Sequence, residues 1–232
     1  MRKVVLTGHS RGLGAALARQ LASHDIEVLG ISSAQVDLAD ATALTRWIAG
    51  GELGRFLAGS ESVGLINNAG MLQPIGPLDT QNVDVVLRAV TLNVGAALAL
   101  SAAFVRATAR RRDRRIMHVS SGAGRKAYAG WDVYCATKAA LDHHARCVAL
   151  EHTPGLLIAS VAPGVIDTDM QAEIRASTAA RFPQRERFVG FHERGELPRP
   201  DDVATRLVEF FLGDEFGREP VADVSLRSAQ AG

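Results

Sequence analysis

The sequence contains little cysteine. Only Cys135 and Cys147 occur in its 232 residues, and they lie twelve residues apart in a segment with a helical pattern. Twelve residues along a helix separate two side chains by about 120° around the axis, which is a poor geometry for a local disulfide. We therefore expect both cysteines to be reduced thiols in a cytoplasmic protein.

The sequence also lacks an excess of charge. Its 26 basic and 25 acidic residues leave a net charge of +1, which gives no general attraction to nucleic acid or anionic lipid. One basic run, at 110–115, follows a long helical pattern, and cations at the C-terminus of a helix account for it. We expect no nucleic-acid partner.

Long hydrophobic runs and metal-binding patterns are missing as well. The longest uncharged segment, 89–105, has 17 residues with polar ones among them, fewer than the roughly 20 apolar residues that a membrane-spanning helix needs. The first residues contain no apolar stretch adequate for a signal peptide. The seven histidines show no spacing typical of a metal site. We expect no membrane segment, no metal and a cytoplasmic location.

What the sequence does contain is an alternation of strand-like and helix-like segments. Strands are predicted at 3–7, 27–31, 63–67, 115–120, 156–162 and 220–225, and helices at 13–23, within 40–58, at 80–110, 131–152 and 201–212. Such alternation requires right-handed crossovers and a parallel sheet covered on both faces, with the ligand beyond the carboxyl ends of the strands. We predict an α/β fold, a single Rossmann-like doubly wound domain over residues 1–232.

A glycine-rich turn follows the first predicted strand. Gly8, Gly12 and Gly14 separate that strand from an amphipathic helix. Glycine permits positive φ and close backbone approach, and the N-terminus of a new helix attracts a diphosphate. The spacing Gly-x-x-x-Gly-x-Gly differs from the commonest dinucleotide fingerprint, Gly-x-Gly-x-x-Gly. The turn favours a dinucleotide site, and a plain strand-to-helix turn is the alternative.

A tyrosine and a lysine lie four residues apart farther along the chain. Tyr134 and Lys138 share one face of a predicted helix. A cation within roughly 4–6 Å of a phenol lowers its pKa by about 1–3 units. We therefore expect Lys138 to lower the pKa of Tyr134 so that the phenol exchanges a proton near neutral pH; an exposed pair of helical neighbours is the alternative.

Six motifs together resemble the short-chain dehydrogenase/reductase family. They are TGHSRGLG at 7–14, NNAG at 67–70, Asn93, Ser121, YCATK at 134–138 and PGVIDT at 163–168, in the family's order and approximate spacing. The resemblance spans residues 3 to about 225 and implies an NAD(P)-dependent oxidoreductase.

The resemblance implies a role for each catalytic residue. Ser121, thirteen residues before Tyr134, would hold the substrate carbonyl oxygen. Tyr134 would donate the proton, and Lys138 would bind the nicotinamide ribose as well as lowering the pKa of Tyr134. Asn93 would belong to a proton relay that reaches Lys138 through water, with a satisfied core asparagine as the alternative.

The resemblance also implies the cofactor contacts. Asp37 would contact the adenine, Asn68 the adjoining ribose, and Thr168 the carboxamide; a helix N-cap and a turn asparagine are the alternatives for the first two. The expected cofactor-binding residues are Gly8, Ser10, Arg11, Gly12, Leu13, Gly14, Ser32, Asp37, Asn68, Ala69, Gly70, Tyr134, Lys138, Pro163, Gly164, Val165, Ile166 and Thr168.

The end of the second predicted strand bears on cofactor choice. An acidic residue there would bind the ribose hydroxyls of NAD and repel a 2′-phosphate, but this chain has Ser32 and Ser33. Arg11, in the glycine turn, can pair with that phosphate. We therefore predict that NADP(H) is preferred over NAD(H).

Two segments, at 130–135 and 164–171, are similar to the sepiapterin reductase and benzil reductase branch of the family. That similarity implies reduction of a small-molecule ketone, an α-dicarbonyl or an aryl ketone. Ser121, Trp131, Tyr134 and Met170 would contact the substrate, with a buried packing role as the alternative for Trp131. Residues 169–196 are expected to form a mobile flap over the substrate.

Other functions are also compatible with these motifs. An alcohol dehydrogenase uses the same residues in the reverse direction, and an NADP(H)-sensing binding protein keeps the glycine turn without catalysis. A cofactor-free interaction protein is the third alternative. The Ala- and Leu-rich segment of the 80s to 100s suggests a homodimer or homotetramer, although core burial alone also explains its composition.

Overall fold

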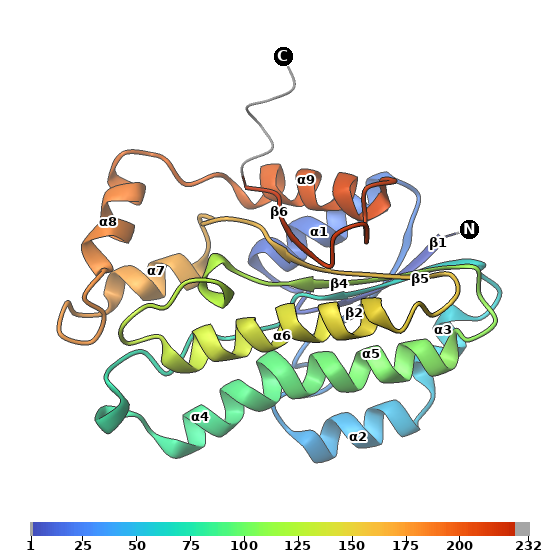
Figure 1. The fold of residues 1–232 in the computed structure, drawn as a ribbon, viewed down its shortest axis with the longest axis horizontal. Helices are drawn as coiled ribbons and strands as arrows, with labels where there is room; N and C mark the ends of the chain where they lie inside the picture. The colour runs from blue at the N-terminus through green and yellow to red at the C-terminus, as the bar shows by residue number, and fades with distance from the viewer. Residues whose placement is uncertain (1, 226–232) are drawn as a thin grey trace.

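The sheet consists of six parallel strands. The computed structural model describes residues 2–225, and its strands are β1 (Arg2–Thr7), β2 (Glu27–Ile31), β3 (Ser62–Asn67), β4 (Asp113–Val119), β5 (Leu156–Ala162) and β6 (Val221–Asp223). They lie in the order β2-β1-β3-β4-β5-β6. Figure 1 shows the sheet between two layers of helices. The order reverses direction beside β1, so the point where a ligand binds in such sheets lies beyond the carboxyl ends of β1 and β3. The predicted α/β fold is confirmed.

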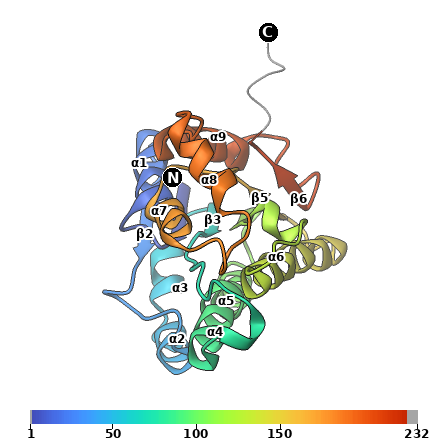
Figure 2. The same cartoon turned by 90° about the vertical axis from the view of Figure 1, so that its left-hand side faces the viewer.

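Helices cover both faces of the sheet (Figure 2). On one face, α1 (Gly12–Ser23) packs beside α9 (Pro200–Leu212), and Leu17, Val203 and Leu207 are fully buried there. The opposite face carries α3 (Glu52–Leu57), α5 (Ala96–Ala107) and α6 (Asp132–Leu150), with Leu100 and Phe104 fully buried against the strands. The two apolar layers cover both faces of the sheet. Because the strands are parallel, their carboxyl ends lie at one edge.

Two predicted helices are divided in the structure. The segment 40–58 forms α2 (Ala41–Ala49) and α3, because Gly51 adopts a left-handed φ of 73° between them. The segment 80–110 forms α4 (Val83–Val90), a π-helical segment η2 (Thr91–Gly95) and α5, preceded by the short helix η1 (Leu78–Thr80). A π turn inserts one residue without ending the helix, so the helical periodicity of the sequence does not reveal it.

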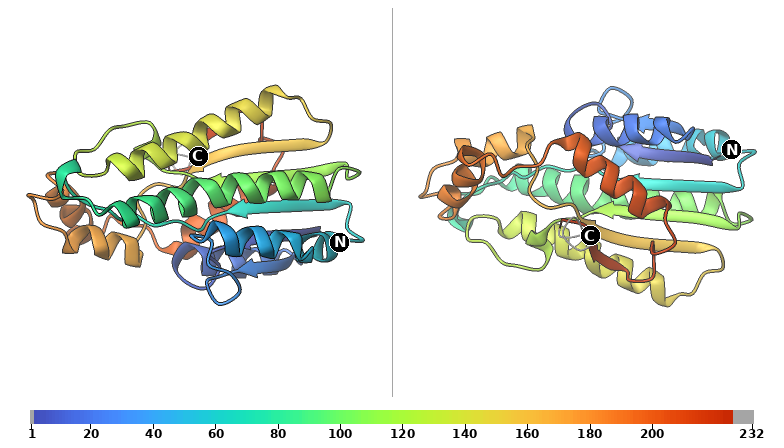
Figure 3. Two further views of the ribbon diagram at one scale, coloured as in Figure 1. Left: turned by 90° about the horizontal axis from the view of Figure 1, so that it is seen from below. Right: turned by 90° about the horizontal axis from the view of Figure 1, so that it is seen from above.

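The predicted flap contains two helices. Residues 169–196 form α7 (Asp169–Ala176) and α8 (Arg185–Glu193), which extend beyond the carboxyl ends of the strands (Figures 1 and 3). Phe182, between them, is fully buried, and Phe188 is 5% exposed. These side chains share an apolar cluster with Trp131 and Tyr134 of α6, so the segment packs against the end of the sheet where a ligand is expected.

One helix is long and apolar enough to cross a membrane by length and composition alone. It spans Val83–Ala107 with a mean hydropathy of 1.7. Core helices of soluble proteins pass the same test, and α5 packs its buried side chains against the sheet.

Candidate active site

The glycine turn after β1 leaves room for a bound group at the N-terminus of α1. Gly8 and Gly12 have φ values of 68° and 51°, which favour glycine. A Cβ at Gly14 would lie 1.9 Å from the carbonyl oxygen of Gly8, so only glycine lets α1 pack this close to the turn. Among residues 2–225 no side chain caps the helix, so its first N–H groups are open to an anion. This cradle fits the diphosphate of a dinucleotide.

The turn is held from beneath by Thr7 and Asn68. The Thr7 hydroxyl accepts hydrogen bonds from the backbone N–H groups of Asn68 and Ala69, each at 3.0 Å. The Asn68 side chain donates to the carbonyl oxygens of Thr7, at 3.0 Å, and Gly8, at 3.2 Å. Its amide thus braces the turn, and contact with a ribose stays a prediction. The role of Thr7 was missed from the sequence, although a polar residue that ends an apolar strand signals it.

The other predicted cofactor residues also follow strands. Those of the glycine turn follow β1, Ser32 follows β2, Ala69 and Gly70 follow β3, and the run from Pro163 to Thr168 follows β5. Gly12 brings two of these segments together, because the atoms nearest to a Cβ there would belong to Thr168, the closest at 3.7 Å. Leu13 is 9% exposed, and its side chain belongs to the apolar layer between α1 and the sheet. Whether each residue contacts a cofactor stays a prediction.

The residues expected on the adenine side have partners within the protein. Asp37 accepts from the backbone N–H of Ala39 at 2.9 Å and forms an ion pair with Arg88 at 3.2 Å. The alternative of a helix N-cap at Asp37 is wrong, because the carboxylate that caps α2 belongs to Asp40.

Ser32 and Arg11 are also partnered. The backbone N–H and hydroxyl of Ser32 both donate to the side-chain oxygen of Gln35. Arg11 lies 3.5 Å from Asp169 in an ion pair whose side chains are about four-fifths exposed. Solvent screening weakens such a pair, so Arg11 remains available to another anion.

Asn93 lies in the π-helical segment η2 and is 1% exposed. Its side-chain oxygen accepts from the backbone N–H of Met71 at 2.8 Å, and its side-chain nitrogen donates to the Met71 carbonyl and the Thr137 hydroxyl. A Cβ at Gly70 would lie 3.3 Å from the Asn93 oxygen and 3.7 Å from the Lys138 ammonium. The Asn93 oxygen and the Lys138 ammonium therefore both lie next to Gly70, which has no side chain to separate them. The proton relay stays a prediction. π turns are frequent at functional sites.

Ser121, Tyr134 and Lys138 come together where β4 ends against α6. Tyr134 is 8% exposed and Lys138 is 5% exposed. The Lys138 ammonium lies 5.6 Å from the centroid of the Tyr134 ring and donates to the Val119 carbonyl at 2.8 Å. Ser121 begins the short helix η3 (Gly122–Gly124), and its hydroxyl accepts from Ala123 N–H at 3.2 Å. A serine hydroxyl, a phenol and an ammonium thus lie within one partly enclosed corner.

The expected lowering of the Tyr134 pKa by Lys138 is wrong for this structure. Burial raises the pKa of Tyr134 to about 12, although a hydrogen bond with Ser121 acts in the opposite direction. Burial also lowers the pKa of Lys138 to about 8, against the attraction of Asp142, which raises it. The Lys138 ammonium donates to the Val119 carbonyl and lies 5.6 Å from the centroid of the Tyr134 ring, and desolvation of the phenolate is the largest influence on the pKa of Tyr134. Near neutral pH the phenol is therefore protonated.

Trp131 lies in an aromatic cluster that joins α6 to the predicted flap. Its ring stacks on Phe182, with centroids 4.2 Å apart, and meets the Tyr134 ring edge-on at 5.7 Å. Trp131 is only 4% exposed, which matches the packing alternative. The Tyr134 hydroxyl donates to the Met170 sulfur at 4.0 Å, so Met170, at the start of α7, lies directly against the phenol. Substrate contacts by Trp131 and Met170 stay predictions.

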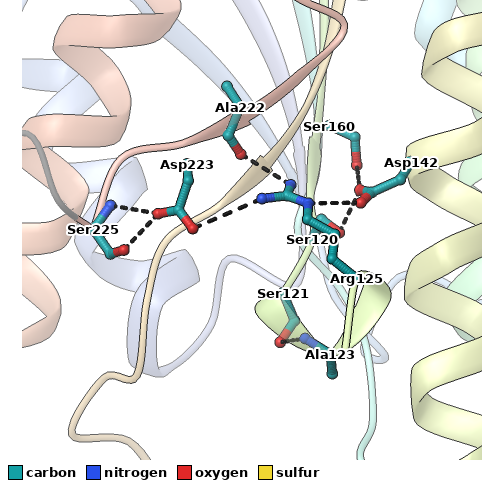
Figure 4. Close-up of polar contacts among 9 residues, drawn as sticks. All are labelled: Ser120, Ser121, Ala123, Arg125, Asp142, Ser160, Ala222, Asp223 and Ser225. Carbon is teal, nitrogen blue, oxygen red and sulfur yellow. Dashed lines mark hydrogen bonds and ion pairs between the residues drawn. The ribbon is translucent and has the colours of Figure 1, made fainter. Parts of the chain in front are cut away.

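Asp142 is a buried residue that the sequence analysis missed. It lies four residues after Lys138 on α6 and is 1% exposed. One carboxylate oxygen accepts from the Ser120 and Ser160 hydroxyls, each at 2.7 Å, and the other accepts from Arg125 at 3.0 Å (Figure 4). The four-residue spacing from Lys138 was a signal that could have identified it.

No metal site is apparent near these groups. Within residues 2–225, no three His, Cys, Asp or Glu side chains lie close enough together to hold a metal ion. Both cysteines are free thiols.

Comparison with known proteins identifies the family of the chain. The family model of short chain dehydrogenases matches residues 62–179. The chain is 32% identical to benzil reductase ((S)-benzoin forming) of Bacillus cereus, over 93% of this chain and 96% of that one. It is 26% identical to sepiapterin reductase of Xenopus laevis, over 91% of each chain.

A solved structure agrees as well. A short-chain dehydrogenase/reductase from Burkholderia vietnamiensis is 44% identical, with a TM-score of 0.68, and the match covers 97% of this chain and 98% of that one. The fold, the glycine turn and the Ser121–Tyr134–Lys138 corner thus occur in a chain whose relatives are reductases. The protein therefore belongs to the short-chain dehydrogenase/reductase family, in the branch of the benzil and sepiapterin reductases, and is an NAD(P)-dependent oxidoreductase.

Proposed function

We propose that the protein is an NADPH-dependent carbonyl reductase that acts on an α-dicarbonyl or an aryl ketone. The observation that carries the proposal is the meeting of Ser121, Tyr134 and Lys138 at the end of β4, on the same edge of the sheet as the glycine turn. The 32% identity to a benzil reductase supports the substrate class.

The three side chains divide the work of carbonyl reduction. When bound, NADPH supplies the hydride. The Ser121 hydroxyl donates a hydrogen bond to the carbonyl oxygen, and Tyr134 donates the proton that converts this oxygen to a hydroxyl. Burial raises the pKa of Tyr134 to about 12, so the phenol carries its proton at neutral pH. The Lys138 ammonium then stabilises the phenolate that remains, since burial leaves its pKa at about 8 and most of it charged at pH 7.

The surroundings of Tyr134 favour an aromatic or otherwise apolar substrate. The edge of Trp131 and the sulfur of Met170 lie against the phenol. Both groups contact an aryl ketone favourably, whereas a sugar would bring hydroxyls that these groups cannot satisfy. The segment 169–196 carries Met170, so we propose that it closes over the substrate.

Two features support NADPH over NADH. No carboxylate ends β2, where Ser32 lies, and Arg11 is a cation in the glycine turn with only a screened partner. A 2′-phosphate would therefore meet the cation of Arg11 and no carboxylate at the end of β2.

Assembly into a homodimer or homotetramer and a cytoplasmic location complete the proposal. Val83, Leu87 and Val90 are 70%, 60% and 44% exposed on α4, at spacings that place them along one side of the helix. Only 33% of the apolar window in Val83–Ala107 is buried within the chain. A second copy of this helix would cover that surface.

The test is NADPH oxidation by the purified protein with benzil, a pterin side-chain diketone, a simple sugar and an acyl thioester. We expect turnover of the two dicarbonyls and a higher kcat/KM with NADPH than with NADH. Turnover of sugars or acyl thioesters alone would overturn the substrate class, and equal efficiency with both cofactors would overturn the preference. Tight NADPH binding without turnover of any ketone or alcohol would instead favour a cofactor-sensing protein.

A further inference from the structure

The buried carboxylate of Asp142, on α6, connects the segments around Ser121 at the candidate active site. Its hydrogen bonds reach Ser120 at the end of β4, Ser160 on β5 and Arg125 after η3 (Figure 4). Arg125 also donates to the carbonyl oxygen of Ala222 on β6, at 3.0 Å. A buried ion pair is favourable only when its remaining hydrogen-bonding capacity is satisfied, and here both carboxylate oxygens are bonded.

These bonds fix the backbone on both sides of Ser121. Val119 accepts from Lys138, Ser120 donates to Asp142, and Ser121 follows directly. On the far side of Ser121, a Cβ at Gly124 would lie 2.9 Å from the backbone carbon of Lys138, so the η3 turn packs directly on α6. The position of the Ser121 hydroxyl relative to Tyr134 therefore depends on how β4 and η3 are joined to α6.

Asp142 also supplies the negative charge that faces Lys138. On α6, Lys138 has Tyr134 on one side and Asp142 on the other, and Asp142 raises its pKa against the effect of burial. From β4 it faces His118, whose pKa Lys138 helps to lower, and from η2 the uncharged Asn93. Farther from Lys138, the guanidinium of Arg125 pairs with Asp142. The Arg125 Nη1 atom also lies 3.7 Å from the Asp223 carboxylate.

We propose that the Asp142–Arg125 ion pair is a positioning unit of the active site. It joins the turn that carries Ser121 to the helix that carries Tyr134 and Lys138, and Asp142 holds the Lys138 side chain in its charged form. The pair itself touches neither substrate nor cofactor. This inference rests on the proposed function only for its effect on turnover, because the charge of Lys138 is measurable without a substrate.

The composition of the chain makes that measurement direct. Its three lysines are Lys3, Lys126 and Lys138, so selective ¹³C labelling of lysine gives few signals to follow by NMR as pH is raised. We expect Lys138 to titrate near pH 8 in the wild type. Asp142→Asn keeps the size and one oxygen acceptor but removes the charge, so the midpoint should fall by about one pH unit.

Arg125→Met tests the same pair from its exposed side. The Arg125 side chain is 28% exposed, so water can reach the space that the guanidinium leaves. Arg125 and Lys138 share the carboxylate of Asp142. Without the competing cation of Arg125, that carboxylate should stabilise the charged form of Lys138 more, so the titration midpoint of Lys138 should move to higher pH. If Asp142→Asn leaves the midpoint unchanged, or if both variants move it in the same direction, the electrostatic part of the proposal is wrong.

A matched control lies at the other end of β4. Asp113 also accepts from a serine hydroxyl, that of Ser62 at 2.6 Å, and from an arginine, Arg115 at 3.2 Å. Asp113→Asn therefore makes the same chemical change far from Ser121, and it should leave both the Lys138 midpoint and the turnover at wild-type values.

Turnover tests the positioning part. We expect kcat of Asp142→Asn with benzil to fall about tenfold or more, with the KM for NADPH nearly unchanged, because a small displacement of Ser121 from Tyr134 is costly. An unchanged kcat would show that the pair does not position Ser121. If the wild type itself turns over no carbonyl substrate, the proposed function fails, and the Lys138 midpoints still decide the electrostatic part.

Discussion

The two halves of the sheet bury their polar groups in different ways. At the ends of β1 and β3, polar side chains bond to backbone: Thr7 accepts from two N–H groups, and Asn68 donates to two carbonyls. At the ends of β4 and β5, charged and polar side chains bond to one another around Asp142, beside a buried Lys138. The first arrangement fixes the backbone shape of the glycine turn. The second fixes the backbone around Ser121 and also places the charges of Asp142 and Arg125 near Lys138. Substitutions in the first half should therefore act through geometry, and those in the second through geometry and protonation.

The largest expected effect is on the proton donor of the second half. Tyr134→Phe removes the hydroxyl and little else, so NADPH-dependent turnover should fall roughly 10²–10⁴-fold while NADPH affinity is retained. The control is Tyr128→Phe, because Tyr128 is the other tyrosine of the chain and packs on Trp131 in the same cluster. Steady-state kinetics and NADPH titration measure both effects. Substantial turnover by Tyr134→Phe would disprove the assignment.

A purely geometric effect is expected in the first half. Gly14→Ala would bring a Cβ within 1.9 Å of the Gly8 carbonyl oxygen, so the turn and α1 must separate. We expect a loss of about 1–3 kcal/mol in the free energy of unfolding and weaker NADPH binding, both independent of pH.

Gly54→Ala, in α3, is the matched control for this change. A Cβ at Gly54 meets nothing within 4 Å, and alanine in a helix is favoured over glycine by about 0.5–1 kcal/mol. Denaturant unfolding and NADPH titration compare the two variants. A Gly14→Ala protein as stable and as tightly bound to NADPH as the wild type would show that the turn tolerates a side chain.

An effect that depends on pH is expected from His118 in the second half. His118 is fully buried on β4, between the Asn67 amide at 3.1 Å and the His144 ring at 3.0 Å. Burial, together with the charges of His144 and Lys138, lowers the pKa of His118 to about 3. The unfolded chain binds a proton near pH 6.5 and the folded chain does not, so stability is lost as pH falls from about 6.5 towards 3.

The His118 contribution can be isolated by substitution. His118→Gln should reduce the slope of unfolding free energy against pH in this window by up to about 1.4 kcal/mol per pH unit, whatever its effect at neutral pH. His192→Gln, at an exposed position on α8, is the control. An unchanged slope in His118→Gln would mean that His118 takes up its proton in the folded protein.

The sequence predicted the fold because its signals are local. Alternating apolar runs and glycine turns specified each strand to within one or two residues at either end; β6, for example, was expected at 220–225 and spans Val221–Asp223. The predicted family, α/β fold and oxidoreductase class are confirmed. The π turn at Thr91–Gly95 was not predicted, because its extra residue leaves the apolar pattern of the helix almost unchanged.

The residue types at the candidate site were determined by the sequence alone. A serine, a tyrosine and a lysine in this spacing, after a glycine turn, resemble the short-chain dehydrogenase/reductase family, and that resemblance indicated an oxidoreductase site. Their protonation was decided by the tertiary structure. The pKa values of Tyr134 and Lys138 depend on burial and on the carboxylate of Asp142, which packing brings against segments distant in the chain. Desolvation is a property of the surrounding layers, so no local spacing of residues encodes it.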